Sequence, residues 1–325
     1  MKKILGLGNP LIDVLTILES DDLLSDFSLP KGSMQLVDQD LSGKISAQLK
    51  NDNRFLVTGG SASNTISGLA KLGVTVGFVG KIGNDEMGSF FQADSERIGV
   101  KSHLVRSDSP SGVCIWLVSP DGERTMATCL GAACEMTPND LNEDTFTGYD
   151  CCYFEGYWVQ NRDLILTAMQ IAKKSGLKIS MDLASYNVVL ENIDFLKQIT
   201  RDYVDILFAN EEEAKAFTGK EPEKALDEIA SICEIAVVKL GAQGSYIKRG
   251  ECKYEIAPMP DVVCLDSTGA GDLYAAGFLY GLTKGLPLQE CGRIGSIVAG
   301  NVVQVIGPKL DDEKWNMIKS QNLII

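Results

Sequence analysis

Short apolar runs alternate with segments of helical periodicity along most of this chain, and this alternation constrains its fold more than any other feature. Lys2–Leu7 and Val76–Gly80 have the length and composition of buried strands, whereas Ser61–Leu72 and Asp85–Ile98 repeat apolar residues at helical spacing. Strands that alternate with helices pair in parallel, because each crossover helix returns the chain to the same edge of the sheet. The sequence therefore predicts an α/β fold with a doubly wound, mainly parallel sheet and helices on both faces. Ligands of such sheets bind outside the carboxyl ends of the strands.

One region departs from this alternation. Gly112–Val118 and Glu123–Cys129 flank a turn at Pro120–Gly122, which is typical of a β-hairpin. Together with an irregular stretch over residues 13–42, the region 110–132 is predicted to form a small β-sheet that projects from the α/β body as a lid. The alternative is an edge hairpin of the main sheet. No linker or repeat divides the chain, so we expect residues 1–325 to form a single domain.

The net charge of the chain limits the classes of partner that it can bind. Its 325 residues carry a formal net charge of -14 at pH 7, which opposes binding to nucleic acid and to anionic membranes. An anionic ligand would need backbone N–H groups, a few placed cations or Mg²⁺ to hold it against this field. Nine scattered cysteines without a CxxC pair favour a reduced, cytoplasmic setting. The single histidine, His103, argues against histidine-based nucleophilic catalysis and histidine-rich metal sites.

The strongest local signal is the run Asp266–Asp272, which a helical segment follows directly. Its glycines and small side chains leave the backbone N–H groups of residues 269–272 open at the start of a helix, where an anion gains hydrogen bonds and the favourable end of the helix dipole. Asp272 would lie in the same turn, within reach of a hydroxyl that attacks a bound phosphate. The alternative is that Asp272 only caps the helix.

Two further segments place polar residues at the start of helices. Gly59–Gly60 leads into a helix that carries Asn64, where a ligand could approach the backbone and meet both a donor and an acceptor; the alternative is a tight turn. Asn210 and Glu213 follow a predicted strand on the ligand side of the sheet, and their oxygens suit Mg²⁺, often through water. The alternative for this segment is a charged first turn of a helix. That alternative is the favoured interpretation for Glu211 and Glu212.

A glycine loop, Lys239–Gly244, lies between two strand-like runs and is either a nucleotide contact or a hairpin turn. Two common nucleotide fingerprints are absent. The pattern GxxxxGK[ST] does not occur, and Gly6-Leu7-Gly8 lacks the third glycine because position 11 is Leu11. P-loop enzymes and dinucleotide-binding enzymes are therefore disfavoured.

These segments resemble, in the same order along the chain, the motifs of the ribokinase-like (PfkB) family of kinases. Strand and helix order agree with that family over nearly the whole chain. Within the family, residues 8–13, 31–35 and 204–211 are most similar to the adenosine kinase branch. The resemblance implies a ribokinase-like fold with a small β-lid, and transfer of the γ-phosphate of ATP to a hydroxyl.

The resemblance also implies roles for individual residues. Asp272 would be the catalytic base, and the anion hole would comprise Gly269, Ala270 and Gly271. The acceptor would be held by Asp13, Gly59, Gly60, Asn64 and Trp158. The ATP site would comprise Lys239, Gly241, Gly244 and, from the lid, Arg124. Asn210 and Glu213 would organise Mg²⁺ through water, and Asp266 and Thr268 would form a site for a monovalent cation such as K⁺.

The identity of the acceptor is less determined than the reaction. Trp158, with Tyr157 beside it, could stack on adenine and favour a ribonucleoside with a primary hydroxyl; the alternative is that both rings pack in the core or lid. Asp182 and Ser267–Thr268 depart from the animal adenosine kinases, so ribose, fructose or 2-keto-3-deoxygluconate remains an alternative acceptor. A non-catalytic sensor is the third hypothesis, against which the intact Asp272 argues. The resemblance also makes the lid a candidate homodimer surface.

Overall fold

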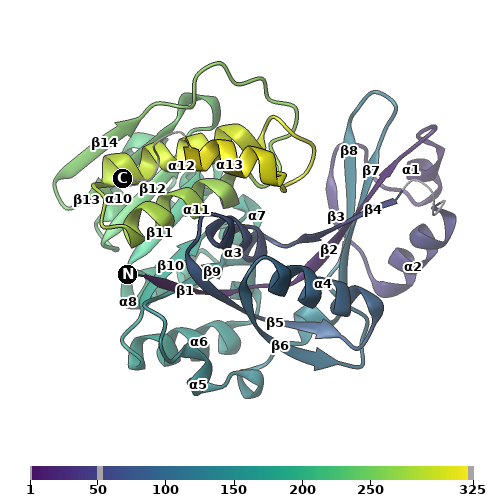
Figure 1. The fold of residues 1–325 in the computed structure, drawn as a ribbon, viewed down its shortest axis with the longest axis horizontal. Coiled ribbons are helices and arrows are strands. Elements are labelled where there is room, and N and C mark those ends of the chain that lie inside the picture. Colours follow the sequence, from purple (N-terminus) through teal and green to yellow (C-terminus); the bar gives the residue numbers. More distant parts are fainter. Residues whose placement is uncertain (1, 50–53, 321–325) are drawn as a thin grey trace.

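The computed structural model describes residues 2–49 and 54–320. Within them, nine strands form a central sheet in the order β14-β13-β12-β11-β10-β9-β1-β5-β6 (Figure 1). The strands from β12 to β6 are parallel, and β13 and β14 are antiparallel additions at one edge, which confirms the predicted doubly wound sheet. The strand bounds are Lys3–Leu7 (β1), Thr75–Gly83 (β5), Val100–Ser107 (β6), Cys151–Glu155 (β9), Lys178–Asp182 (β10), Ile206–Asn210 (β11), Ile235–Lys239 (β12), Ser245–Arg249 (β13) and Cys252–Ile256 (β14).

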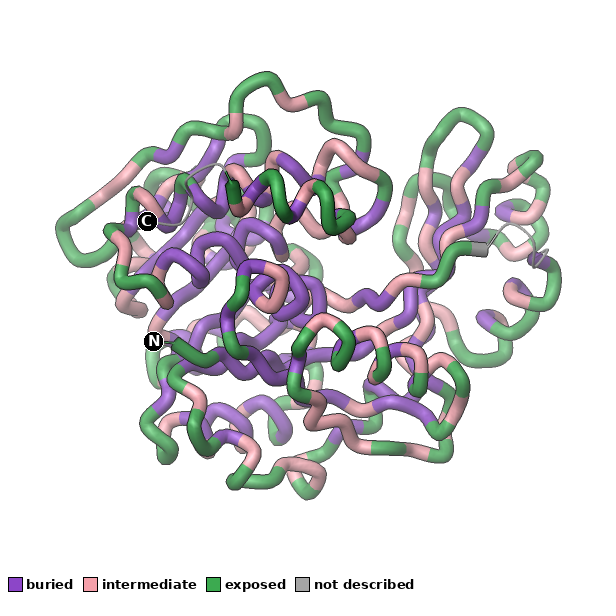
Figure 2. Tube along the Cα trace, viewed as in Figure 1, coloured by how far each residue is buried: buried purple, intermediate pink, exposed green. Residues whose placement is uncertain are grey.

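Helices cover both faces of this sheet, as predicted. Alternate residues of the central strands pack to opposite sides, because Ile4 and Tyr153 join one apolar cluster while Leu5 and Phe154 join the other. The helices of the first cluster are α3 (Ser61–Lys71), α4 (Glu86–Arg97), α11 (Ala270–Thr283), α12 (Leu288–Val302) and α13 (Asp312–Ser320). The helices of the second are α5 (Glu143–Phe146), α6 (Arg162–Lys174), α7 (Tyr186–Glu191), α8 (Ile193–Tyr203), α9 (Glu211–Thr218) and α10 (Pro222–Ala230). The buried trace in Figure 2 follows the central strands between these layers. None of the helices described is both long and apolar enough to cross a lipid bilayer.

A second sheet projects to one side of this body, in the strand order β3-β8-β7-β2-β4 (Figure 1). Its strands are β2 (Leu11–Ile17), β3 (Met34–Leu36), β4 (Arg54–Gly59), β7 (Gly112–Val118) and β8 (Arg124–Cys129). The predicted hairpin is confirmed as the antiparallel pair β7 and β8, and it belongs to this sheet rather than to the main one.

The stretch expected to be irregular is instead largely regular. It contains β2, α1 (Asp22–Asp26), β3 and the start of α2 (Gln39–Gln48). The strand β2 is not evident from local pattern because its partners β4 and β7 come later in the chain, and because it buries the polar residues Asp13 and Thr16 among its apolar ones.

The two faces of the second sheet differ in what covers them. One face packs on α1 and α2 through an apolar cluster that includes Ile115 and Leu117. Strand register arranges the side chains of the other face in two rows. The inner row is Leu36, Thr128, Cys114, Asp13 and Val57, and the outer row is Met34, Met126, Trp116, Leu15 and Phe55. Leu36 is 60% exposed and Phe55 is 63% exposed. Apolar side chains are therefore exposed at the two edge strands of this face, whereas Asp13, Cys114 and Trp116 in its middle are buried.

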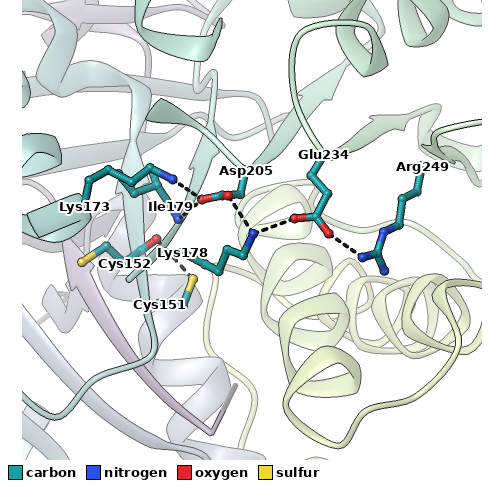
Figure 3. A network of polar contacts seen from close by, with 8 residues as sticks. All are labelled: Cys151, Cys152, Lys173, Lys178, Ile179, Asp205, Glu234 and Arg249. Atoms are coloured by element: carbon teal, nitrogen blue, oxygen red, sulfur yellow. Dashed lines mark hydrogen bonds and ion pairs between the residues drawn. The ribbon is translucent and has the colours of Figure 1, made fainter. Parts of the chain in front are cut away.

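At the edge of the main sheet where the strands begin, a charge network joins neighbouring strands (Figure 3). Asp205 accepts hydrogen bonds from Lys173 (2.6 Å), from Lys178 (2.9 Å) and from a backbone N–H of β10 (2.7 Å). Lys178 also pairs with Glu234, which contacts Arg249 of β13. Each charged side chain of this network has a partner of opposite charge, which favours a structural role for this edge.

Candidate active site

Polar side chains end four neighbouring strands at the carboxyl edge of the main sheet. Glu155 ends β9, Asp182 ends β10, Asn210 ends β11 and Lys239 ends β12. The register sets Asp182 opposite Glu155 and Asn210 opposite Lys239. The first turn of α11 lies against the same edge, since a Cβ atom added to Gly271 would be 3.0 Å from Nζ of Lys239. The topology thus brings together segments that are far apart in sequence, at the edge where the sequence predicted a ligand site.

Asp272 is held between the first turns of two helices. Ser61 Oγ donates to its Oδ1 (2.7 Å), and Asn64 Nδ2 donates to its Oδ2 (3.0 Å). Thr65 Oγ1 also donates to the backbone carbonyl of Asp272 (3.1 Å). All three donors come from α3. No side-chain hydrogen bond caps the start of α11, so the contacts of Asp272 with α3 are not helix capping. The Oδ1 atom of Asn64 is buried and has no partner among the described residues, which leaves an unused acceptor on a side chain that contacts Asp272.

The environment of Asp272 changes its basicity. Burial raises the pKa of Asp272 to about 6, the hydrogen bonds from Asn64 and Ser61 limit the rise, and the nearby charge of Asp182 adds to it. A carboxylate with this pKa is still ionised at neutral pH but is a stronger base than an ordinary aspartate.

The loop before α11 is the predicted anion site, and its backbone turns sharply into the helix. Gly269 has a φ of 73°, a left-handed conformation that glycine adopts without strain, and it turns the chain into the helix. The N–H groups of Gly271 and Asp272 have no acceptor in the described chain. The N–H of Ala270, which was predicted to join them, instead donates to the Ser267 carbonyl (3.1 Å). Fewer backbone N–H groups are therefore open than the sequence predicted.

Lys239 adds a cation to this anion site. Its Nζ pairs with Asp182 at 2.6 Å and lies close to Gly271. Burial alone would lower the pKa of Lys239, but the charges of Asp182, Glu213 and Asp272 raise it above its ordinary value. Lys239 thus carries its positive charge beside the open N–H groups.

Asn210 and Glu213 form a reciprocal cap at the start of α9. Glu213 accepts from the backbone N–H and from Nδ2 of Asn210 (both 2.8 Å), and Asn210 Oδ1 accepts from the Glu213 N–H (2.8 Å). Burial, together with the charge of Asp182, raises the pKa of Glu213 to about 7. No group of three or more metal-ligating side chains occurs in the described part of the chain. Each Glu213 oxygen accepts one hydrogen bond from Asn210 and keeps a lone pair, so these residues could orient water ligands of Mg²⁺, and that role stays a prediction.

Glu155 is a buried acid that the sequence did not single out. Its carboxylate accepts from the N–H of Asn9 (2.7 Å) and from the N–H of Ala62 in the first turn of α3 (3.1 Å). Burial raises its pKa to about 8, with the backbone hydrogen bonds opposing the rise. Glu155 therefore ties the end of β9 to the turn that presents Ser61 and Asn64. Only its position at the end of a strand could have indicated this role.

Asp13 enters the site from the second sheet. A side chain at Gly59 would collide with its carboxylate, and one at Gly60, which has a φ of 95°, would collide with the Asn9 carbonyl. Neither position has room for a side chain, because the Asp13 carboxylate lies close to Gly59 and the Asn9 carbonyl lies close to Gly60. Burial raises the pKa of Asp13 to about 7, and the charge of Lys309 limits this rise. Lys309, which no motif marked, donates to Ser67 on α3 (3.2 Å).

The remaining nucleotide-site predictions fall on a turn. Residues 241–243 form a short 3-10 turn between the antiparallel strands β12 and β13, and the N–H of Leu240 donates to the Gly244 carbonyl (2.8 Å). Gly244 has a φ of 93°, and a side chain there would collide with the Ile256 carbonyl. The hairpin-turn interpretation of Gly241 and Gly244 accounts for their glycines, and their contact with a nucleotide stays a prediction.

Trp158 lies in the core. It is 3% exposed and belongs to the apolar cluster on the α6 face of the sheet, where it meets Phe154 edge to face at a ring-centroid distance of 6.5 Å. A ring enclosed in this way has no free face for a base, so the geometry favours the packing alternative over the predicted stacking on a substrate. Tyr157 is only partly buried, and burial raises its pKa above the ordinary range, with Glu155 and Asp272 nearby.

Comparisons with known proteins agree with this arrangement. The model of the pfkB family carbohydrate kinases matches residues 36–315. The crystal structure of a probable sugar kinase from Rhizobium etli CFN 42 is 33% identical, with a TM-score of 0.89 and coverage of 99% of both chains. That of an adenosine kinase from Sinorhizobium meliloti is 34% identical, with a TM-score of 0.85 over 95% of this chain and 96% of that one. Adenosine kinase from Saccharomyces cerevisiae is 28% identical over 336 residues, which cover 96% of this chain and 98% of that protein.

The fold and these likenesses define a ribokinase-like α/β kinase. The match over most of its length shows that the chain belongs to the pfkB family of carbohydrate kinases. It is therefore a phosphotransferase that acts on a hydroxyl group of a nucleoside or a sugar, and the non-catalytic hypothesis is set aside.

The titration of Asp272 predicts the pH dependence of phosphate transfer. A carboxylate that accepts a proton must be ionised, so kcat should fall by about tenfold per pH unit as the pH drops below about 6. The measurement is kcat across the acid range with saturating substrates, and the thermal unfolding temperature at each pH controls for loss of folded protein. A kcat that stays level well below the Asp272 pKa in still-folded protein would contradict this account.

Proposed function

We propose that this kinase transfers the γ-phosphate of ATP to a primary hydroxyl of an adenosine-like ribonucleoside, with Asp272 as the general base. The observation that carries the proposal is the placement of Asp272. Ser61 and Asn64 fix its carboxylate between two helices, directly beside the open N–H groups of Gly271 and of its own backbone. A phosphoryl group on those N–H groups would have the base at the side from which a hydroxyl attacks.

The anion site would act on the transferred phosphoryl group. Gly269 and Gly271 admit it to the backbone, and the helix N-terminus and Lys239 stabilise the negative charge that it spreads over its oxygens. When bound, Mg²⁺ would supply further positive charge on the phosphates, with Asn210 and Glu213 orienting its water ligands. Gly241 and Gly244 remain the proposed neighbours of the nucleotide.

The second sheet supports a nucleoside as acceptor. Asp13 and the unpartnered Oδ1 of Asn64 offer acceptors for sugar hydroxyls, next to Gly59 and Gly60. The outer row beyond Asp13 is wholly apolar and is exposed at Met34 and Phe55, and residues two apart on a strand are separated by about 7 Å. A base could therefore contact the apolar row while its ribose meets Asp13. The likeness to proteins named adenosine kinase agrees with this.

A free sugar is the second candidate acceptor, and one observation favours it. Trp158, which would have stacked on a base, is enclosed in the core. A sugar would use the Asp13 and Asn64 acceptors and leave the outer row uncovered. The likeness to a protein named probable sugar kinase agrees with this alternative.

The second sheet would also serve as a lid, because its strand β2 carries Asp13 and follows the carboxyl end of β1, and because the sheet projects to one side of the body (Figure 1). Its closure would exclude water from the phosphoryl group. The exposed apolar side chains of its outer row could alternatively bind a second copy of the chain, which is the proposed homodimer.

Replacing Asp272 with Asn should lower kcat by about 10²–10⁴-fold, because the amide cannot take the proton of the acceptor hydroxyl. ATP binding, measured by calorimetry, should change little, since the backbone N–H groups and Lys239 are kept. Asp202→Asn, at an exposed position on α8, is the matched control and should behave like the unmodified protein. Near-normal turnover by Asp272→Asn would remove Asp272 as the base.

Replacing Phe55 or Leu36 with Ser tests the acceptor. If the apolar rows hold a base, KM for adenosine should rise by about tenfold while KM for ATP is unchanged, because each replacement removes roughly 1–2 kcal/mol of apolar contact. Met317→Ser, at a 42% exposed position on α13, is the control. Turnover with ribose or fructose and none with adenosine would favour the sugar alternative. If the Phe55 or Leu36 variant sediments differently from the unmodified protein while its KM for adenosine is unchanged, these side chains belong to a dimer surface.

A further inference from the structure

The carboxylate of Asp266 is held by three nitrogen donors. Its side chain is 2% exposed, and it lies just before the anion-binding loop. Oδ1 accepts from the Thr268 N–H (3.0 Å) and forms an ion pair with Arg124 Nη1, and Oδ2 accepts from the Gly307 N–H (2.6 Å). A buried carboxylate needs this compensation, because an unpaired charge in the interior costs several kcal/mol.

The family resemblance implied a monovalent-cation site built on Asp266 and Thr268. The arrangement around Asp266 does not fit such a site. A cation such as K⁺ is held by oxygen atoms, and at Oδ1 it would have to displace the Thr268 N–H or Arg124, while at Oδ2 it would lie close to the positive charge of Arg124. The positive charge beside Asp266 is instead the guanidinium of Arg124, whose side chain is 19% exposed. Its second nitrogen, Nη2, points to the Leu265 carbonyl at 3.4 Å.

Arg124 belongs to the second sheet, whereas Asp266 belongs to the main body. Arg124 starts β8 and pairs with Val118 at the end of β7, so it sits beside the tip of the hairpin. Gly307, which holds the other oxygen, is followed by Pro308, and Pro308 packs against Gly269 of the anion site. The Asp266 carboxylate thus joins the hairpin, the anion-binding loop and the Gly307 segment at a single point.

We propose that Arg124 is a positioning residue that supplies the positive charge at Asp266, so that this kinase holds its anion-binding loop without a monovalent cation. The proposal rests on the proposed role of Gly271 and Asp272 in phosphate transfer. It also assigns Arg124 to Asp266 rather than to the phosphates of ATP.

The test compares turnover in buffers whose only monovalent cation is tetramethylammonium with turnover after K⁺ replaces it at constant ionic strength. The unmodified protein should change by less than about twofold. Arg124→Ala should lose at least about tenfold in tetramethylammonium and recover most of it in K⁺, because a small cation can then enter beside Asp266. Arg249→Ala removes an arginine–carboxylate pair at the far edge of the sheet (Figure 3), and it should show neither effect.

Thermal unfolding gives a second measurement that does not depend on activity. K⁺ should raise the unfolding temperature of Arg124→Ala and leave that of the unmodified protein unchanged. The double variant Arg124→Ala with Asp266→Asn should lose the K⁺ effect, because it has no carboxylate to neutralise. This measurement also separates the two proposals, since a protein that phosphorylates no tested acceptor can still show the cation effect.

Three outcomes would overturn the inference. They are a strong K⁺ requirement in the unmodified protein, an Arg124→Ala defect that K⁺ does not relieve, and a K⁺ effect on Arg124→Ala that survives Asp266→Asn. The second outcome would move Arg124 to the phosphates, as the sequence comparison first suggested.

Discussion

The contact between the first turns of α3 and α11 is the interaction on which the rest of the site depends. Ser61 and Asn64 donate to the Asp272 carboxylate, and Thr65 donates to its carbonyl. The α3 end is set in turn by Glu155, whose carboxylate holds the Ala62 N–H. If Asp272 is the base, as proposed, its fixed position between two helices would limit the entropy lost when the acceptor arrives, which is how positioning contributes to catalysis. The same contact keeps the anion-binding N–H groups at a constant distance from the base.

The site concentrates negative charge in a chain that is already acidic. Burial raises the pKa of Asp272 to about 6, of Asp13 and Glu213 to about 7, and of Glu155 to about 8. Each of these acids binds a proton more tightly in the folded state, so their contributions to stability decline as the pH rises between the ordinary and the raised pKa. Lys239 offsets part of this charge at Glu213 and Asp272, and Lys309 offsets part of it at Asp13. The placed cations, rather than net charge, make the edge suitable for an anion.

Much of the fold and part of the site could be predicted from the sequence, and the remainder depends on contacts that leave no local pattern. Helices and parallel strands have strong periodicity, and the Asp266–Asp272 run signals a helix N-terminus by itself. By contrast, β2 is defined by its pairing with later strands, and Glu155 looks like any acid after a strand until its backbone partners are seen. The role of Trp158 stayed open at the level of sequence, because an aromatic near a strand end can turn toward the ligand or into the core, and sequence does not distinguish these.

The most direct test of the account is the structure of the protein with a non-hydrolysable ATP analogue and the acceptor that supports turnover. The account predicts that the acceptor's primary hydroxyl oxygen lies within hydrogen-bonding distance of an Asp272 carboxylate oxygen. It also predicts the γ-phosphate analogue on the N–H groups of Gly271 and Asp272, with the attacked phosphorus in line between hydroxyl and leaving oxygen. A hydroxyl held away from Asp272, with another side chain at its proton, would contradict the central claim.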